Sequence, residues 1–139
     1  FKPGPELEGV EKPPNQGINH VNNASYDNPA PTSGGHSPNA VACGIYSDAV
    51  PPERAVHSME HGSVIVWYSP DQPELAGEIL AATSEFDSHV IISPNPGIES
   101  AVVATAWNRR KAWDDVNDDM VDFVDIYRQR GPESVACPR

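Results

Sequence analysis

The sequence predicts an α+β fold: a small mixed sheet of three to four strands with two main helices and a short histidine-bearing helix, preceded by a long Pro-rich irregular N-terminal region. Three observations support this prediction. Nine of the 15 prolines lie within residues 1–52. Short apolar runs flank a helical stretch between residues 63 and 107, and a strong apolar stripe at helical spacing follows them. At 139 residues the chain is long enough for one domain of ordinary size.

The proline distribution divides the chain into an arm, a cover and a core. Residues 1–18 are predicted to form an extended Pro-rich arm, and residues 19–139 a single compact domain. Within that domain, residues 19–52 are a loop-rich cover and residues 53–139 an α/β core, because the cover has neither a helical nor a strand period. The composition of the arm is typical of disorder, and such an arm is ordered only if its own domain or a neighbouring chain holds it.

The predicted sheet comes from three apolar runs. Residues 63–68 are bounded by glycine and proline and indicate a buried strand. A proline then opens a helix predicted over residues 73–86, and residues 89–93 indicate a second strand. Turn residues separate that strand from a third at residues 101–107. A strand–helix–strand unit followed by a tight turn predicts a small mixed sheet with helices on at least one face.

The last helix is the most regular element of the pattern. Its apolar stripe at three- and four-residue spacing comprises Trp113, Val116, Met120, Phe123, Val124 and Tyr127. Aspartates occupy the other side and indicate a solvated face, while Arg128 and Arg130 are placed in the last turn, where the helix dipole favours cations. The Gly-Pro pair at residues 131–132 ends the helix.

The charge balance excludes two classes of partner. The chain has 20 acidic and 9 basic residues and a formal net charge of −11. Nucleic acid is excluded because phosphate neutralisation needs clustered Lys and Arg, and electrostatic binding to anionic membrane surfaces is excluded for the same reason. No apolar run reaches the roughly 18 residues that a transmembrane helix needs.

The cysteines predict an oxidising compartment. Cys43 and Cys137 fit a disulfide that would tie the C-terminal tail to the loop region, and the alternative is two unrelated reduced thiols. The first residue is Phe1 and not Met, which suits a processed product with a possible membrane tether upstream of Phe1. These observations favour an extracytoplasmic protein, secreted, at the cell surface or membrane-anchored with the domain outside.

The predicted short helix over residues 52–61 has two chemically distinct sides. At 100° per residue, Ala55, Val56 and Met59 share an apolar side, and the opposite side carries Glu53, His57, Glu60 and His61. Two His at i and i+4 on one helix face can chelate a single metal ion. His20 and His36 lie in the preceding loop region. The sequence therefore predicts zinc or copper held by His57, His61, His36 and His20.

Alternatives to this metal site stay open. The histidines can instead donate hydrogen bonds to loop carbonyls and fasten the Pro-rich segment to the domain. Met59 would be a copper ligand only if its segment is not helical. Residues 57–61 also match H-x-x-E-H, the zinc-binding pattern of the inverzincin metallopeptidases, in which Glu60 would be the catalytic general base. Those enzymes need a long helix, whereas this one ends after about three turns.

Two motifs resemble a known family. Tyr26 precedes Pro-Thr-Ser-Gly-Gly-His at residues 31–36, and Val-His-Ser-Met-Glu-His-Gly follows at residues 56–62. This order resembles bacterial domain-of-unknown-function family 3105, and the likeness extends over about residues 18–135, through Trp107 and the Gly-Pro-Glu run that follows the last helix. The resemblance implies an exported protein without an assigned activity. The family usually has Leu in place of Met59, which supports a packing role for this residue.

The predicted function is an exported, non-catalytic metal-binding domain that takes zinc or copper. One alternative is a structural or assembly subunit of an extracellular or membrane-associated complex, with a protein partner or a second copy bound through the arm at residues 1–18. A second alternative is the H-x-x-E-H metallohydrolase. The sequence identifies no substrate.

Overall fold

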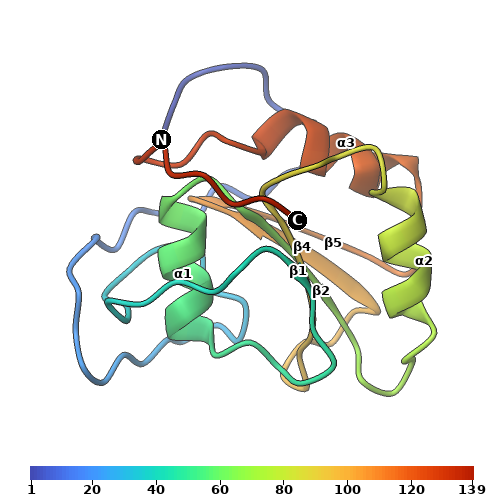
Figure 1. Ribbon diagram of the computed structural model, residues 1–139, viewed down its shortest axis with the longest axis horizontal. Coiled ribbons are helices and arrows are strands. Elements are labelled where there is room, and N and C mark those ends of the chain that lie inside the picture. Colours follow the sequence, from blue (N-terminus) through green and yellow to red (C-terminus); the bar gives the residue numbers. More distant parts are fainter.

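The computed structural model describes residues 1–139 and shows an α+β fold with three helices and a five-stranded mixed sheet (Figure 1). The strands are β1 (Gly44–Ile45), β2 (Val64–Tyr68), β3 (Val90–Pro94), β4 (Val102–Ala106) and β5 (Arg109–Trp113). The helices are α1 (Pro52–Glu60), α2 (Leu75–Ala82) and α3 (Asp118–Tyr127). The strand order is β1-β3-β2-β4-β5.

The centre of the sheet is buried on both faces. β2 pairs in parallel with β3, the strand that follows the α2 crossover, and β2 pairs antiparallel with β4. Every residue of these three strands is buried, which explains why they appear in the sequence as continuous apolar runs instead of alternating ones. β4 then pairs antiparallel with the edge strand β5, and β1 pairs in parallel with β3.

The two faces of the sheet build two separate cores. On one face Val64 and Val66 of β2 pack with residues of α2 and α3, such as Ile79 and Phe123. On the other face Ile65 and Trp67 pack with α1 and with residues of the N-terminal loops. α1 is therefore the only helix on its side of the sheet. The loop region covers the side of α1 that faces away from the sheet.

The sheet has more strands than the three to four predicted. β1 lies inside the stretch predicted to be only loop, and β5 follows a two-residue turn in which Asn108 adopts a positive φ of 57°. Trp113 was assigned to the last helix, which is wrong: it ends β5, and α3 begins at Asp118. Trp113 nevertheless packs edge-on against Phe123 of α3, with ring centroids 5.9 Å apart. Its sequence spacing fitted the apolar stripe of a helix, but the contact joins β5 to α3.

The last helix is also shorter at its C-terminal end than predicted. It ends at Tyr127, Arg128 is its C-cap, and Gln129 has a positive φ of 67°. Arg130 was placed in the last turn but lies beyond the helix, where its guanidinium donates hydrogen bonds to the carbonyl oxygen of Lys2, among others. The predicted helix over residues 73–86 likewise contracts to α2.

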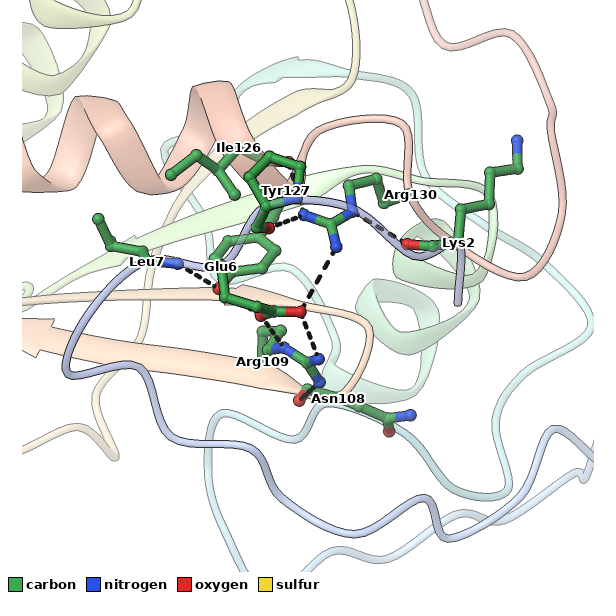
Figure 2. Close-up of polar contacts among 9 residues, drawn as sticks. Lys2, Glu6, Leu7, Asn108, Arg109, Ile126, Tyr127 and Arg130 are labelled. Atoms are coloured by element: carbon green, nitrogen blue, oxygen red, sulfur yellow. Dashed lines mark hydrogen bonds and ion pairs between the residues drawn. The ribbon is translucent and has the colours of Figure 1, made fainter.

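The Pro-rich region before β1 contains no helix or strand, and its arm is held by its own domain (Figure 2). The Glu6 carboxylate receives two hydrogen bonds from Arg109, at 2.8 and 2.9 Å, and one of 2.8 Å from the hydroxyl of Tyr127. The guanidinium groups of Arg109 and Arg130 both lie over the ring of Phe1, at 4.4 and 4.7 Å from its centroid. These contacts attach the first residues of the arm to their own domain.

Candidate metal centre

α1 is positioned by both of its sides. Pro52 occupies its first turn, and Ala55, Val56 and Met59 are fully buried in the core against the sheet. Because the segment is helical, Met59 points away from the histidines, which excludes it as a copper ligand and confirms its packing role. The opposite side carries His57 and Glu60, which are 7% and 4% exposed because the loop region covers them.

His36 lies beneath this cover and is fully buried. Its Nδ1 lies 2.8 Å from the carbonyl oxygen of Gly34, which can only accept, so Nδ1–H donates and Nε2 carries the lone pair. That Nε2 is buried and has no hydrogen-bond partner. Burial also lowers the pKa of His36, which favours the neutral ring. An orphaned lone pair on a neutral imidazole is the electronic state of a metal ligand.

His57 is oriented in the same way. Its Nδ1 lies 2.7 Å from the carbonyl oxygen of Ser37 and donates to it, which leaves Nε2 as the acceptor. The Nε2 atoms of His57 and His61 are 3.0 Å apart. In metal-binding histidines one ring nitrogen usually donates to a carbonyl or carboxylate, which fixes the tautomer and aims the other nitrogen at the ion. Two loop residues three positions apart, Gly34 and Ser37, supply such acceptors here.

Glu60 faces the imidazoles. One carboxylate oxygen lies 3.5 Å from His36 Nε2 and 3.8 Å from His20 Nε2. Burial, with the nearby carboxyl group of Glu133, raises the pKa of Glu60 to about 7. This position is that of a ligand beside the histidines, and no lysine or arginine forms an ion pair with this carboxylate.

His20 completes the cluster from the solvent side, with its side chain 49% exposed. The backbone pairs His20 with His36: the N–H of Val21 donates to the carbonyl oxygen of His36 at 2.7 Å, and the N–H of His36 donates to that of Asn19 at 2.9 Å. The ring of His20 stacks on His57, with centroids 4.8 Å apart.

The four predicted histidines thus gather at one face of α1, but they do not all join one set of ligand atoms. His20, His36, His57 and Glu60 each offer an atom within 4.8 Å of the others. Ligand atoms on a tetrahedral zinc ion are roughly 3.4 Å apart, given bonds of about 2.0–2.1 Å, so modest side-chain rotations would bring this set to one ion. His61 belongs instead to a second set with Glu60 and Glu133, again within 4.8 Å.

Glu133 is the site residue that the sequence analysis did not assign. It follows α3, far along the chain, and only the family likeness of the Gly-Pro-Glu run drew attention to it. Its N–H donates to the carbonyl oxygen of Glu60 at 2.9 Å, and its carboxylate lies 3.9 Å from His61 Nε2. The fifth histidine, His89, takes no part: it is buried immediately before β3 and its Nε2 lies 2.8 Å from the carbonyl oxygen of Val135.

Two glycines bring the C-terminal segment against the end of α1. A Cβ on Gly131 would overlap the carbonyl oxygens of Met59 and Glu60. A Cβ on Gly62, which has a φ of +102°, would lie 2.9 Å from the Cα of Gln129. Only residues without side chains allow backbones to approach this closely, so the glycines place Glu133 beside the last turn of α1.

The predicted disulfide between Cys43 and Cys137 is present, with Cα atoms 5.6 Å apart. It ties the C-terminal tail to the end of the loop region just before β1. The tail is also held by the N–H of His89, which donates to the carbonyl oxygen of Cys137 at 2.9 Å. A disulfide is typical of an oxidising, extracytoplasmic environment. None of the three helices has the length and apolar character that crossing a membrane requires.

Comparison with known proteins identifies the family. Searches of the curated proteins and of the solved structures returned no significant match. A family model, in contrast, matches residues 18–139, which include all the residues of the candidate metal centre, the disulfide and the whole sheet. This agrees with the resemblance seen in the histidine motifs, and the chain belongs to the family described as "Protein of unknown function (DUF3105)".

Proposed function

We propose that this protein is an exported metal-binding domain that holds zinc or copper at the face of α1, through His20, His36, His57 and Glu60. The observation that carries the proposal is the Nε2 atom of His36, which is buried, bears a lone pair and makes no hydrogen bond within the protein, although a Glu60 oxygen lies 3.5 Å away. Leaving such an atom unpaired costs about 1–3 kcal/mol, and a bound cation would remove that cost.

The donor set supports these metals over others. Three imidazoles and one carboxylate suit zinc or Cu(II), whereas calcium and magnesium prefer oxygen ligands throughout. Soft sulfur ligands that would select Cu(I) are absent, because Met59 is turned into the core and both cysteines form the disulfide. The disulfide supports the extracytoplasmic location. His61, predicted as a ligand of the same ion, belongs to the second set of ligand atoms.

Metal analysis of protein purified without an affinity tag tests the proposal. We expect at least one zinc or copper ion per chain, restored by added metal after treatment with a chelator. His36→Gln should weaken zinc binding by more than about 100-fold, because it removes a ligand from a preorganised set. The matched control is His89→Gln, which changes a buried histidine outside the cluster and should leave binding unchanged. A metal content well below one that added zinc or copper does not restore would refute the proposal.

The two alternative functions, a metallohydrolase and an assembly subunit, have fewer supporting contacts. Glu60 faces His20 and His36 as a ligand would, so its place as a free general base in an H-x-x-E-H hydrolase has no supporting contact. The arm is held by Arg109, Arg130 and Tyr127 of its own chain, and assembly through residues 1–18 stays a prediction. Removing those residues and measuring the particle size in solution would test it.

A further inference from the structure

The two sets of ligand atoms at α1 share one residue. The first set is His20, His36, His57 and Glu60, and the second is Glu60, His61 and Glu133. Glu60 is therefore shared by two groups of donors: one of its oxygens lies near His36 and His20, and it also forms a set of ligand atoms with His61 and Glu133. A carboxylate that belongs to two groups of ligands can bridge a two-metal site, in which the ions are about 3.5–4 Å apart.

We propose that the protein holds two divalent cations at α1, the first in the histidine set and the second between His61 and Glu133, with Glu60 bridging them. This proposal deepens the proposed function and rests on it. In this arrangement His61 and Glu133 are ligands of the second ion and not of the first.

The local charge supports a second cation. Glu60 and Glu133 are neighbouring carboxyl groups, and no lysine or arginine forms an ion pair with either of them. The Glu133 carboxylate lies 3.9 Å from Nε2 of His61, within reach of an ion that both would bind. Like charges in a partly buried site repel, and a divalent ion between the two carboxylates turns that repulsion into attraction at both.

The accessibility of the two sets differs. His36 and Glu60 are buried, whereas the side chains of His61 and Glu133 are 20% and 52% exposed. His61 also lines a groove of about 800 Å³, whose other walls include Lys2 and residues 134–138 of the C-terminal tail. The second ion would have three protein ligands and would keep at least one open coordination position facing water, which is the pattern of zinc sites that bind exogenous ligands.

A competing arrangement uses the same residues. The 3.0 Å between the Nε2 atoms of His57 and His61 also fits two ligands of a single ion, which would make one centre with His61 as an additional ligand. The two arrangements differ in the number of ions per chain and in the effect of Glu133. They are therefore separated by stoichiometry.

The test is native mass spectrometry and a Co²⁺ titration of the full chain, stripped of metal with a chelator. We expect two Zn²⁺ or Co²⁺ ions per chain, and a spin-coupled signal from the Co²⁺ pair. Glu133→Gln should lower the stoichiometry to one ion per chain. The affinity of the remaining site, formed by the histidine set, should change by less than about threefold. This substitution changes a half-exposed carboxylate to an amide of the same shape, and circular dichroism and the unfolding midpoint would confirm that the fold is kept. Glu85→Gln, an exposed glutamate after α2, is the matched control and should still bind two ions.

The outcomes separate the two proposals. One ion in the wild-type protein, unaffected by Glu133→Gln, would overturn the two-metal centre and leave the proposed function standing. Two ions in both the wild type and Glu133→Gln would place the second ion elsewhere and would also overturn it. No bound ion at all would remove both proposals.

Discussion

The Nε2 atoms of His57 and His61 lie 3.0 Å apart, the distance of a hydrogen bond, and only one of them carries the shared proton. Nδ1–H of His57 donates to the carbonyl oxygen of Ser37, so Nε2 of His57 is the acceptor and Nε2–H of His61 is the donor in the metal-free protein. A cation bound at His57 must displace this hydrogen bond. The pair is therefore a direct indicator of the metal-free and metal-bound states.

The first prediction concerns these tautomers. Long-range ¹H–¹⁵N spectra of the metal-free protein should show His57 protonated at Nδ1 and His61 at Nε2, and zinc should shift the Nε2 resonance of His57 strongly. His89 is the internal control, because its Nε2–H donates to the carbonyl oxygen of Val135 with or without metal. Protonation of His57 at Nε2 in the metal-free state would contradict the hydrogen bonding described here.

The second prediction is that zinc affinity rises steeply with pH up to about 7. A metal ion competes with protons for its ligands, and the pKa of Glu60 in the metal-free protein is raised to about 7. Below that pH the carboxyl group must lose its proton when metal binds, so affinity should fall about tenfold per pH unit from this group alone. His36 and His61, whose pKa values are lowered by burial, should add to the fall only at lower pH. Competition with a chelator of known affinity at pH 6, 7 and 8 measures this, and equal affinities at pH 6 and 7 would be inconsistent with it.

The third prediction concerns Gly131. Substitution by Ala places a Cβ against the carbonyl oxygens of Met59 and Glu60, so the segment that carries Glu133 must move away from α1. We expect Gly131→Ala to lower the free energy of unfolding by about 3 kcal/mol, as overpacking of a rigid contact does. Gly77→Ala in α2 is the control: its Cβ would meet nothing within 4 Å, and it should be neutral or stabilising by up to about 1 kcal/mol. Urea unfolding of both variants gives the comparison, and equal stabilities would show that the contact yields easily.

The fourth prediction concerns the attachment of the arm. The hydrogen bonds from Arg109, which outweigh the desolvation, lower the pKa of Glu6 from 4.5 to about 2. Because the folded-state pKa is below the unfolded one, this stabilisation is present above pH 4.5 and is lost as the pH falls towards 2. Glu6→Gln should reduce the stability by about 1 kcal/mol at pH 7, a figure that allows for solvent screening of this one-third-exposed side chain, and by much less at pH 2. Glu8→Gln, whose side chain has no such partner, is the control, and an effect of Glu6→Gln that does not depend on pH would argue against the ion pair.

The fifth prediction concerns the disulfide, whose cysteines are 94 positions apart. In the chain-entropy model, closure of a loop of this length stabilises the fold by about 4–5 kcal/mol. The double variant Cys43→Ser with Cys137→Ser should lose about that much in denaturant unfolding, and reduction of the wild type should have a similar effect. Thiol titration of the unfolded, unreduced wild type should find no free thiol. A double variant as stable as the oxidised wild type would show that the tail is held by its other contacts.

Much of the centre of the fold could be predicted from local patterns. The continuous apolar run at residues 63–68 and the two-sided pattern of residues 52–61 follow from burial, which acts on each element separately. The edge strand β5 could not be found in this way. Its residues 109–111 are basic and only partly buried, because they bind the arm and α3 instead of filling a core.

The residues of the candidate site also differ in whether a local sequence pattern could identify them. The sequence placed His57, Glu60 and His61 on one face of a helix because helical periodicity is local, and the loop histidines were included because they are few and near. Glu133 could not be placed, since its position beside His61 depends on the close backbone contact of Gly62 with Gln129 and of Gly131 with the end of α1. Such contacts join distant segments and leave no periodic pattern.

The close backbone contacts made by Gly62 and Gly131 affect the order in which the protein folds and binds metal. The proposed ligands come from near both ends of the chain, and Glu133 can join the others only when the last segment has docked on α1. A nascent or truncated chain that ends before this segment has the histidines but lacks the second carboxylate. A full complement of bound metal would thus follow the completion of the fold, and metal content would report whether a given molecule has finished folding.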